Sequence, residues 1–539
     1  MLKPAHQATL AFTATALVTF ALRSRDCFFV DGAPRCLTVY THPTLLFHPN
    51  NHLLYLVNVL LWTRSVGALG FNLGDPLRFF LAVDTMNGLA AAGSIAILYW
   101  IILRLTSSWK LTTTVCLAYG FTTAFLAQAT NPNEPMVGAF WSFLAIALAL
   151  LSLGDNRLWP LALSGLVFTL AMATYRSMVL IAPAAAVTIV SFASAKKSTP
   201  VNLALRLATL GTAFAAGCVL IFGWAYSLIG VPRAAMLAKF LHQEDAEAYL
   251  DLSLNQWLKL PLGLVRNCFP VVPFFNGMRG FLTGPRSVFL PVTFLIVALW
   301  LGLFFCGNTV LRRWAALNPQ ERTAVLASLT GVVFTLIPLL TWSPLYGKFW
   351  IQPLACLAVL VAVAFGQFSQ ASRQLWVACR IAGLLFLLGV AFNLPWAFRN
   401  HWHQPFEFEE ASKVKQFVGE KDFVVLDRGA DSVSVMYAYL WAHDNQFLPV
   451  MDIATVRRTG LISDVDAAVR NTQAHGGKVF FLGVVDLSKP VWDNFLGKHC
   501  GVPYESFDHY RSAVHLKAQF ESRTGPTFLW ELDSPSPPR

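Results

Sequence analysis

The chain has 539 residues, of which 55% are hydrophobic and 13% charged, whereas about 25% of the residues of an ordinary soluble domain are charged. This composition excludes a soluble globule and a disordered chain. The 40 basic and 29 acidic residues give a net charge of +11. The basic clusters lie at the ends of apolar runs and lack interleaved aromatic residues, so they argue against a nucleic-acid groove.

Charge is unevenly distributed along the chain. The first 400 residues hold 26 basic and 11 acidic residues, and the last 139 hold 14 and 18. Charged groups in or beside a bilayer are costly to keep. Each of the few acids in the first 400 residues is therefore a candidate for function or for ion pairing.

Apolar runs recur from residue 8 to residue 398 and predict about eleven membrane-spanning helices. The runs are residues 8–22, 79–103, 111–128, 136–153, 159–175, 178–194, 204–229, 287–306, 324–342, 349–367 and 381–398. The first run has the length of a signal peptide, but no small-residue cleavage site follows it, so we interpret it as a helix. The sequence thus predicts an α-helical polytopic protein of the inner or plasma membrane.

The loops between these runs predict an orientation. Basic loops fall on one side of the membrane if the N-terminus is cytoplasmic, in accord with the positive-inside rule. Residues 23–77, 129–135, 230–286 and 401–539 then lie outside. We expect the chemistry in these outer segments.

Residues 401–539 follow the membrane domain of residues 1–400 and differ from it in character. Strand-like runs DFVVLD (422–427) and KVFFLGVVDL (478–487) flank a helical stretch, which predicts a small extracytoplasmic α/β domain. Asp427 and Asp486 lie at the ends of the two runs, and ligands can bind at strand C-termini in open α/β sheets. The alternative is that both are surface acids of a structural cap.

Four stretches together resemble a known superfamily. The first loop reads RSRDCFFVDGAPRCLTVYTHPTLLFHPNNHLLYLVNVLLWTRSVGALG, and further on come ATNPNEPMVGAFWSFLAIALALL (129–151), LWPLALSGLVFTLAMATYRSMVLIAPAAAV (158–187) and SPLYGKFWIQPLACLAVL (343–360). In this order they resemble the C-type (GT-C) membrane glycosyltransferases that use polyprenyl-phosphate sugars, which include protein mannosyltransferases and lipid A aminoarabinose transferases.

The resemblance implies a catalytic acid in the first loop, upstream of a His-Pro pair. Asp31, 18 positions before Pro49, is the first candidate for general base, and Asp26 is the second. The chain lacks the Asp-Glu pair of several relatives, which leaves the choice between the two open. The alternative is that both are solvated acids that pair with Arg25 or Arg35.

Three histidines follow in the same loop. His42 and His48 each precede a proline, and His52 follows HPNN, a spacing that also suits a metal site. The resemblance implies instead a rigid turn before the loop helix, with His48 and His52 on the substrate-binding side. It implies no fixed metal set, and a divalent cation stays open as a cofactor.

Four residues outside this loop complete the candidate substrate site. Asp84 and Glu134 are candidates for holding the acceptor, although Asp84 is equally suited to pairing with Arg78. Arg176 and Lys348 correspond to basic residues of the family elements and are candidates for holding the phosphate. The alternative for Arg176 is that it marks the turn between two short helices.

The predicted function is transfer of a sugar from a polyprenyl phosphate to a lipid, glycan or protein acceptor on the outer face, by inverting displacement. The competing hypotheses are a multi-pass transporter or flippase, and a membrane scaffold that displays the C-terminal domain. A transporter predicts repeats between the two halves and charges within the spans. The sequence shows no such repeat, and most acids map outside the spans.

Overall fold

A computed structural model of the chain forms two compact units. The helical unit consists of Met1–Ser24, Leu46–Trp62 and Val83–His401, and the mixed unit of Arg25–Leu45, Thr63–Ala82 and Trp402–Arg539. The structure describes residues 4–24, 32–41, 53–155, 157–195, 198–228, 230–241, 253–269, 286–341, 344–367, 373–402, 405–427, 435–436, 439, 447–450, 461–493, 497, 502–522 and 525–533.

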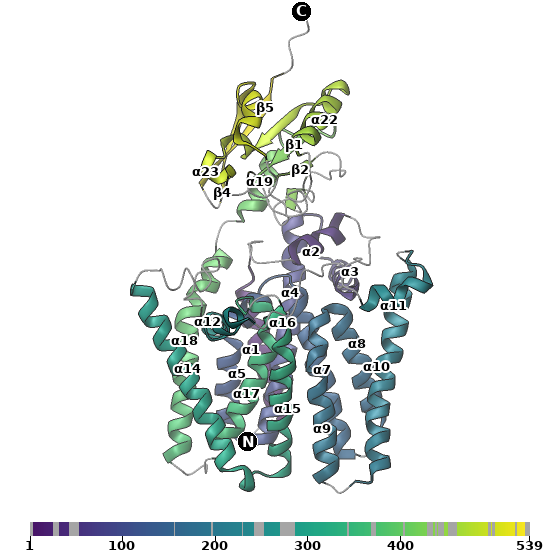
Figure 1. The fold of residues 1–539 in the computed structure, drawn as a ribbon, viewed down its shortest axis with the longest axis vertical. Helices are drawn as coiled ribbons and strands as arrows, with labels where there is room; N and C mark the ends of the chain where they lie inside the picture. Colours follow the sequence, from purple (N-terminus) through teal and green to yellow (C-terminus); the bar gives the residue numbers. More distant parts are fainter. Residues whose placement is uncertain are drawn as a thin grey trace, which may run out of the picture. The chain divides into compact units, whose positions relative to one another are not determined.

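Most of the helical unit is α-helix, with short 3-10 turns (η) between some helices (Figure 1). Its elements are α1 (Pro4–Ala21), α3 (Leu53–Ala68), α4 (Pro76–Thr106), α5 (Trp109–Gly120), α6 (Thr123–Ala129), α7 (Glu134–Asp155), α8 (Trp159–Thr174), η1 (Arg176–Ile181), α9 (Ala182–Ala195), α10 (Pro200–Leu228), α11 (Arg233–Leu241), α12 (Leu254–Cys268), α14 (Arg286–Arg312), η2 (Trp314–Ala316), α15 (Pro319–Thr335), α16 (Ile337–Thr341), η3 (Gly347–Phe349), α17 (Ile351–Gly366) and α18 (Arg373–Trp402). The ends of α3, α4 and α18 extend into the mixed unit.

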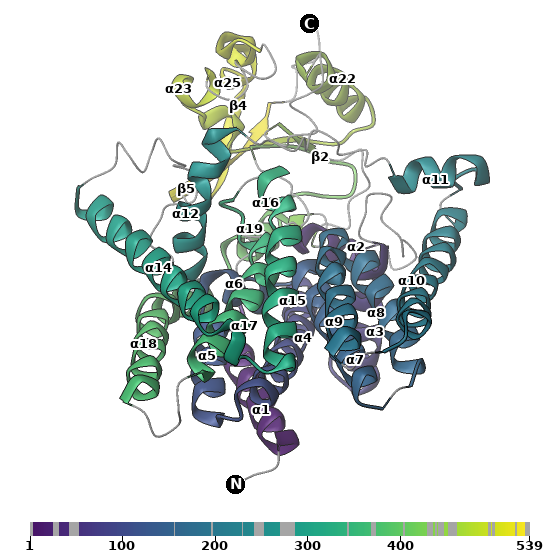
Figure 2. The same cartoon turned by 60° about the horizontal axis from the view of Figure 1, so that its bottom comes forward.

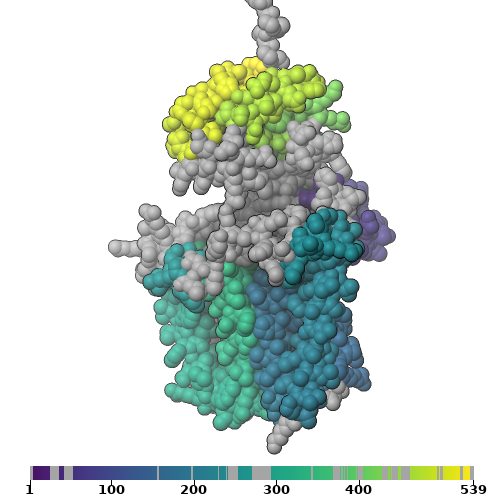
Figure 3. Space-filling view, turned by 45° about the vertical axis from the view of Figure 1, so that its right-hand side comes forward, coloured from purple at the N-terminus to yellow at the C-terminus, as the bar shows by residue number. Residues whose placement is uncertain are grey.

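Within the described chain, six segments are long and apolar enough to cross a membrane. They are Pro76–Thr106, Glu134–Leu153, Arg176–Ala195, Pro200–Leu228, Thr293–Arg312 and Pro319–Thr341. Large apolar side chains such as Val219, Trp224 and Phe304 are exposed on two of these segments, and Figure 3 shows the flank formed by α10. These features confirm a multi-pass helical protein, while the count of about eleven spans and the orientation stay predictions.

The predicted span at residues 111–128 is interrupted in the structure. It forms α5 and α6, because Thr122 turns the chain and its hydroxyl accepts a hydrogen bond from the Phe125 amide. Asn393 on α18 donates to the Phe121 carbonyl oxygen over 2.7 Å and to the Cys268 carbonyl oxygen over 2.8 Å. A polar side chain thereby satisfies a backbone group that the break releases inside the bundle.

Helices α8 and α10 pack closely at Gly165 on α8, where the backbone of α10 leaves no room for a side chain. A Cβ atom on Gly165 would lie 2.5 Å from the Leu210 carbonyl oxygen and 2.8 Å from the Phe214 nitrogen. Small residues allow this approach of helix backbones in membrane proteins. Figures 1 and 2 show α7, α8 and α10 side by side.

Gly165→Ala is therefore expected to destabilise the helical unit by about 1–3 kcal/mol through overpacking. The measurement is the melting temperature of the detergent-solubilised protein. Gly211→Ala on α10 is the matched control, since a Cβ atom there has no neighbour within 4 Å. Equal melting temperatures for the two variants would contradict the close helix contact.

The mixed unit combines helices with one five-stranded sheet (Figures 1 and 2). Its elements are α2 (Gly32–Thr41), α19 (Phe406–Val414), β1 (Phe423–Leu426), β2 (Phe447–Pro449), α22 (Leu461–Ala474), β3 (Val479–Leu482), η4 (Val484–Asp486), α23 (Lys489–Trp492), η6 (Tyr504–Phe507), α25 (Asp508–Arg511), β4 (Val514–Ser522) and β5 (Gly525–Leu532). The strand order is β2-β1-β3-β5-β4, with β1 parallel to β2 and β3, and β5 antiparallel to β3 and β4. The two predicted strands and the helical stretch are confirmed.

The second predicted strand is shorter than the sequence suggested. It ends at Leu482, because Gly483 has a φ of +75° and turns the chain into η4. Asp427 lies against this turn, since a Cβ atom on Gly483 would overlap its Oδ1. Asp486 accepts a hydrogen bond of 2.8 Å from the Trp530 indole N–H, and burial raises its pKa. Both strand-end acids thus contribute to contacts within the fold.

Glu531 on β5 carries a pH-dependent interaction. Its carboxylate lies 2.8 Å from the Lys478 Nζ and 2.9 Å from the Lys517 Nζ. Burial alone would raise its pKa, but the two ammonium groups hold the pKa below the usual value of 4.5. The stabilisation is therefore present above that value and is lost as the pH falls through the lower, folded-state pKa.

Glu531→Gln is expected to speed hydrogen exchange of the β5 amides by about fivefold at neutral pH. The difference from the wild type should vanish in acid, where the wild-type carboxyl is also neutral. Exchange of residues 525–533, followed by mass spectrometry, measures this. A difference that persists unchanged in acid would contradict the role of the ionised carboxylate.

Candidate functional site

Two buried polar residues lie one turn apart on α4, in an otherwise apolar stretch. Asp84 and Asn87 each have a relative exposure of 0%. The Asn87 side-chain amide donates to the Asn131 carbonyl oxygen over 2.7 Å and to the Asn133 carbonyl oxygen over 2.6 Å. Asn87 therefore fastens the connection between α6 and α7 to α4.

The same connection is held by two further hydrogen bonds. The Ser24 amide donates to the Thr130 carbonyl oxygen over 2.8 Å, and the Asn133 side-chain amide donates to Gln128 Oε1. Helix α7 begins at Glu134. A proline follows in its first turn, where proline is favoured in helices. Glu134 is fully buried, and as an acid at a helix N-terminus it complements the helix dipole.

Several buried oxygens at this place have no hydrogen-bond partner in the described part of the chain. They are the side-chain Oδ1 atoms of Asn87, Asn131 and Asn133. The buried Asp84 carboxylate beside them interacts with the Ser24 backbone N–H and with the Arg23 side chain. We call Asp84, Asn87, Asn131 and Asn133 the acceptor cluster.

The acceptor cluster has a chemical preference. A buried acceptor without a donor costs about 1–3 kcal/mol, so native proteins rarely keep several together without purpose. A ligand that presents several O–H or N–H donors would satisfy them. A sugar is a ligand of this kind.

One face of α7 links this cluster to two other elements of the helical unit. Gly138, one turn after Glu134, packs so closely on η1 that a Cβ atom there would lie 2.9 Å from Met178 Cγ. Ser142, one turn further, lies 3.0 Å from the Gln352 amide nitrogen of α17, which also donates to the Met178 carbonyl oxygen over 2.7 Å. Because residues four apart share a helix face, Glu134 lies on the face that meets η1 and α17.

The segment before α17 presents Lys348. Here the Trp350 indole N–H donates to the Pro344 carbonyl oxygen over 2.7 Å and closes the loop. Gly347 permits a close approach to α12, since a Cβ atom there would lie 2.9 Å from Asn267 Oδ1. The Lys348 Nζ lies 5.5 Å from the Phe349 ring centroid and 5.9 Å from that of Tyr346, which limits where the ammonium group can go.

Arg266 on α12 is a second cation beside this loop. Its relative exposure is 7%. Burial lowers its pKa to about 10, and the nearby Tyr346 partly opposes that shift. The guanidinium therefore stays charged at neutral pH in a site of low polarity.

Arg176 begins η1, next to Tyr175, whose ring lies 6.3 Å from the Phe349 ring between centroids. Its guanidinium donates to the Phe240 carbonyl oxygen of α11 and lies 5.2 Å from the Phe240 ring centroid. Arg176 thus joins η1 to α11, which agrees with the structural alternative for this residue.

The predicted site residues divide into two groups. Asp84, Glu134, Arg176 and Lys348 all belong to the helical unit, on elements that the contacts above connect. The other candidates lie outside the described residues: Asp26, Asp31, His42, His48 and His52. Their roles stay predictions, and among the described residues no group of three metal-ligating side chains occurs.

Sequence reasoning missed Asn87, Arg266 and the polar residues of the α6–α7 connection. A signal was present for Asn87, because it follows Asp84 by three positions in an apolar helix, where polar residues are rare and functional. Arg266 lies in the predicted outer loop of residues 230–286, where the helical segment α12 is amphipathic. Its burial depends on how α12 packs, which the sequence does not show.

No protein-family model matches the chain, and no curated protein matches it by sequence. Among the solved structures that match it in fold are two of ArnT. The crystal structure of ArnT from Cupriavidus metallidurans bound to undecaprenyl phosphate has a TM-score of 0.58 at 11% identity, and the apo-state structure has a TM-score of 0.56 at 11% identity. Each match covers 98% of this chain and 99% of the other. The chain therefore shares the fold of these ArnT structures over nearly its whole length, in accord with the resemblance seen in its sequence.

Proposed function

We propose that the protein is an integral-membrane glycosyltransferase that moves a sugar from a polyprenyl phosphate to an acceptor outside the membrane. The observation that carries the proposal is the acceptor cluster, connected through α7 to the cations of η1 and η3. Hydrogen-bond acceptors suit sugar hydroxyls, and cations suit a phosphate. An ArnT structure with this fold holds undecaprenyl phosphate.

In the proposed reaction, Lys348 and Arg176 bind the phosphate of the donor, and Arg266 adds a buried charge beside Tyr346. The bond between the anomeric carbon and the phosphate oxygen breaks, and its electron pair leaves with the phosphate. Positive groups held in place at the leaving group stabilise the charge that develops there. The polyprenyl phosphate remains as the product.

The acceptor supplies the nucleophile. Its hydroxyl oxygen attacks the anomeric carbon from the opposite face, which inverts the configuration, and its proton passes to a carboxylate. Asp31 is the proposed general base, with Asp26 as the second candidate. Asp84 and Glu134 are proposed to hold hydroxyl groups of the sugar or of the acceptor. Both are buried, Asp84 in the acceptor cluster and Glu134 as the first residue of α7.

The proposal is tested by transfer from radiolabelled polyprenyl-phosphate sugars in membranes that contain the wild type, Asp31→Asn or Asp26→Asn. Asp31→Asn is expected to abolish detectable transfer at equal protein abundance, since an amide cannot take the acceptor's proton. Asp26→Asn is expected to keep most of the activity. The opposite pattern would exchange their roles.

The same assay separates the competing functions. A transporter or flippase would move the labelled lipid across the bilayer of a proteoliposome without forming a glycosylated product. A scaffold would give no product and no effect of either substitution. Absence of product from every donor tried, with folded wild-type protein, would count against the transferase.

A further inference from the structure

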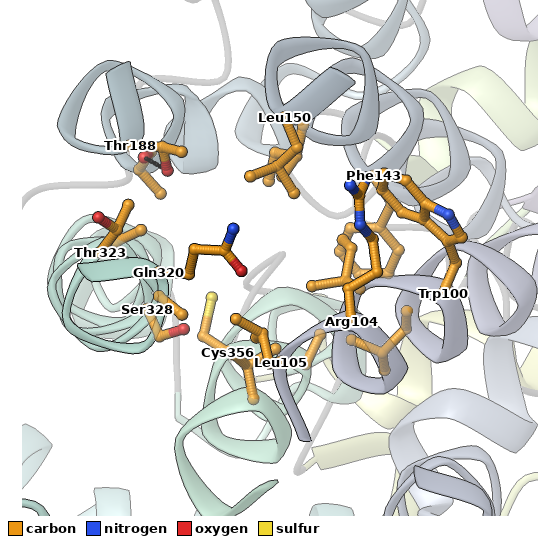
Figure 4. A pocket seen from close by; sticks show the side chains of 18 of the residues that line it. Trp100, Arg104, Leu105, Phe143, Leu150, Thr188, Gln320, Thr323, Ser328 and Cys356 are labelled. Atoms are coloured by element: carbon orange, nitrogen blue, oxygen red, sulfur yellow. Dashed lines mark hydrogen bonds between the residues drawn. The ribbon is translucent and has the colours of Figure 1, made fainter. Parts of the chain in front are cut away.

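A cavity lies in the helical unit, away from the acceptor cluster. It has a volume of about 200 Å³ and is bounded by α4, α7, α9, α15 and α17 (Figure 4). Its body is apolar, with lining residues that include Ile101, Phe143, Leu150 and Ala324. On the same measure a single water needs about 10–15 Å³, so there is room for several methylene groups, and an apolar cavity of this kind disfavours water.

The cavity is at the other end of the bundle from the proposed active site. On α4, Asp84 and Arg104 are separated by about 30 Å of helical rise, which equals the thickness of a bilayer hydrocarbon core. Arg104 lines the cavity and Asp84 belongs to the acceptor cluster. A headgroup at the level of the acceptor cluster would therefore lie about one hydrocarbon-core thickness from Arg104.

The mouth of the cavity is polar. Arg104 and Gln320 both line it and are both exposed. The Arg104 guanidinium lies 4.9 Å from the Trp100 ring centroid, and no carboxylate pairs with it among the residues that the structure describes. Figure 4 shows Arg104 beside Phe143 and Trp100, with Gln320 reaching into the hollow from α15.

The length of the cavity suits one leaflet. Its wall on α7 extends from Phe143 to Leu153, which is about 15 Å of helix. Half of a hydrocarbon core is also about 15 Å. An acyl chain that enters at Arg104 would reach the top of the cavity near the membrane midplane.

We propose that this cavity, the Arg104 cavity, binds one acyl chain of an anionic glycerophospholipid from the leaflet at that end, with the lipid phosphate paired to Arg104. The guanidinium supplies a charge-assisted, two-donor contact to a phosphate, and Gln320 adds an amide donor beside it. The apolar walls take the chain. The bound lipid fills the space between α9 and α17, which follow η1 and η3 in the chain.

Binding is measured on the purified full-length protein in detergent, with phosphatidylglycerol as the probe and native mass spectrometry as the readout. Wild type is expected to bind one phosphatidylglycerol at least tenfold more tightly than phosphatidylcholine. Arg104→Gln and Ala327→Leu are each expected to weaken phosphatidylglycerol binding at least tenfold, by removing the cation and by filling the cavity. Lys110→Gln is the matched control, because Lys110 is exposed at the same end but does not line the cavity.

A phosphatidylglycerol with a photoreactive group in the acyl chain locates the lipid. Crosslinks are expected in residues 98–105, 143–153 and 323–328, which line the cavity. Equal affinity of Arg104→Gln and Lys110→Gln for the probe, or crosslinks confined to other segments, would overturn the proposal. So would tighter binding of oleate or of a polyprenyl phosphate at these segments. Arg104 is exposed, so its substitution tests the proposal even if Ala327→Leu does not fold.

Discussion

Lys348→Met is expected to lower the rate of sugar transfer by about 10²–10³-fold, the usual effect of removing one group that stabilises charge in a transition state. The loop that presents Lys348 is closed by the Trp350–Pro344 hydrogen bond and is packed against α12 at Gly347. Methionine keeps the length and the apolar stem, so the loop is expected to keep its shape. The loss then reports the missing charge on the leaving phosphate.

The measurement is the initial rate of transfer from a radiolabelled polyprenyl-phosphate sugar, with protein abundance checked by gel filtration in detergent. Lys348→Arg is the matched control and is expected to retain about a tenth of the activity or more, since the charge remains but its geometry changes. A methionine variant that transfers at the wild-type rate would remove Lys348 from the proposed mechanism.

Asn87→Leu is expected to cost about 2–4 kcal/mol of stability and to abolish transfer, because two buried carbonyl oxygens lose their donor together. Those carbonyls belong to Asn131 and Asn133, directly before Glu134. Leucine has a similar volume, so the effect is one of hydrogen bonding and not of an empty cavity. The α6–α7 connection is then no longer tied to α4.

Thermal unfolding in detergent and the transfer assay together measure this effect. Asn58→Leu on α3 is a suitable comparison, because the Asn58 Nδ2 has no hydrogen-bond partner among the described residues. That substitution is expected to change stability by less than about 1 kcal/mol. Equal melting temperatures for Asn87→Leu and Asn58→Leu would contradict the conclusion that Asn87 holds the α6–α7 connection to α4.

The sequence predicted the parts of the fold that depend on local pattern. The apolar runs at 79–103 and 136–153 became α4 and α7, and DFVVLD became β1. Both signals are local, since a helix or strand in an apolar setting is determined by a few neighbouring residues. The division of residues 111–128 was missed, because the Phe121 carbonyl oxygen at the break is satisfied by Asn393, which is far along the chain.

The candidate site was predicted in part for a similar reason. Asp84 and Glu134 could be singled out as candidates because acidic residues are scarce in the first 400 residues, and Lys348 because its stretch resembles a family element. Arg266 and Asn131 could not, because a loop arginine and a loop asparagine are ordinary until packing buries them. The burial of Arg266 and Asn131 arises from contacts between segments that are distant in sequence.

The Gln352 side chain limits how a lipid can reach the site. Its amide group contacts both Ser142 on α7 and the Met178 carbonyl oxygen on η1. Separating these elements would break both buried contacts, at about 1–3 kcal/mol for each group left unsatisfied. A long-chain donor that diffuses in the plane of the bilayer is therefore expected to arrive along another flank of the bundle, while α7, η1 and α17 stay together as a fixed wall.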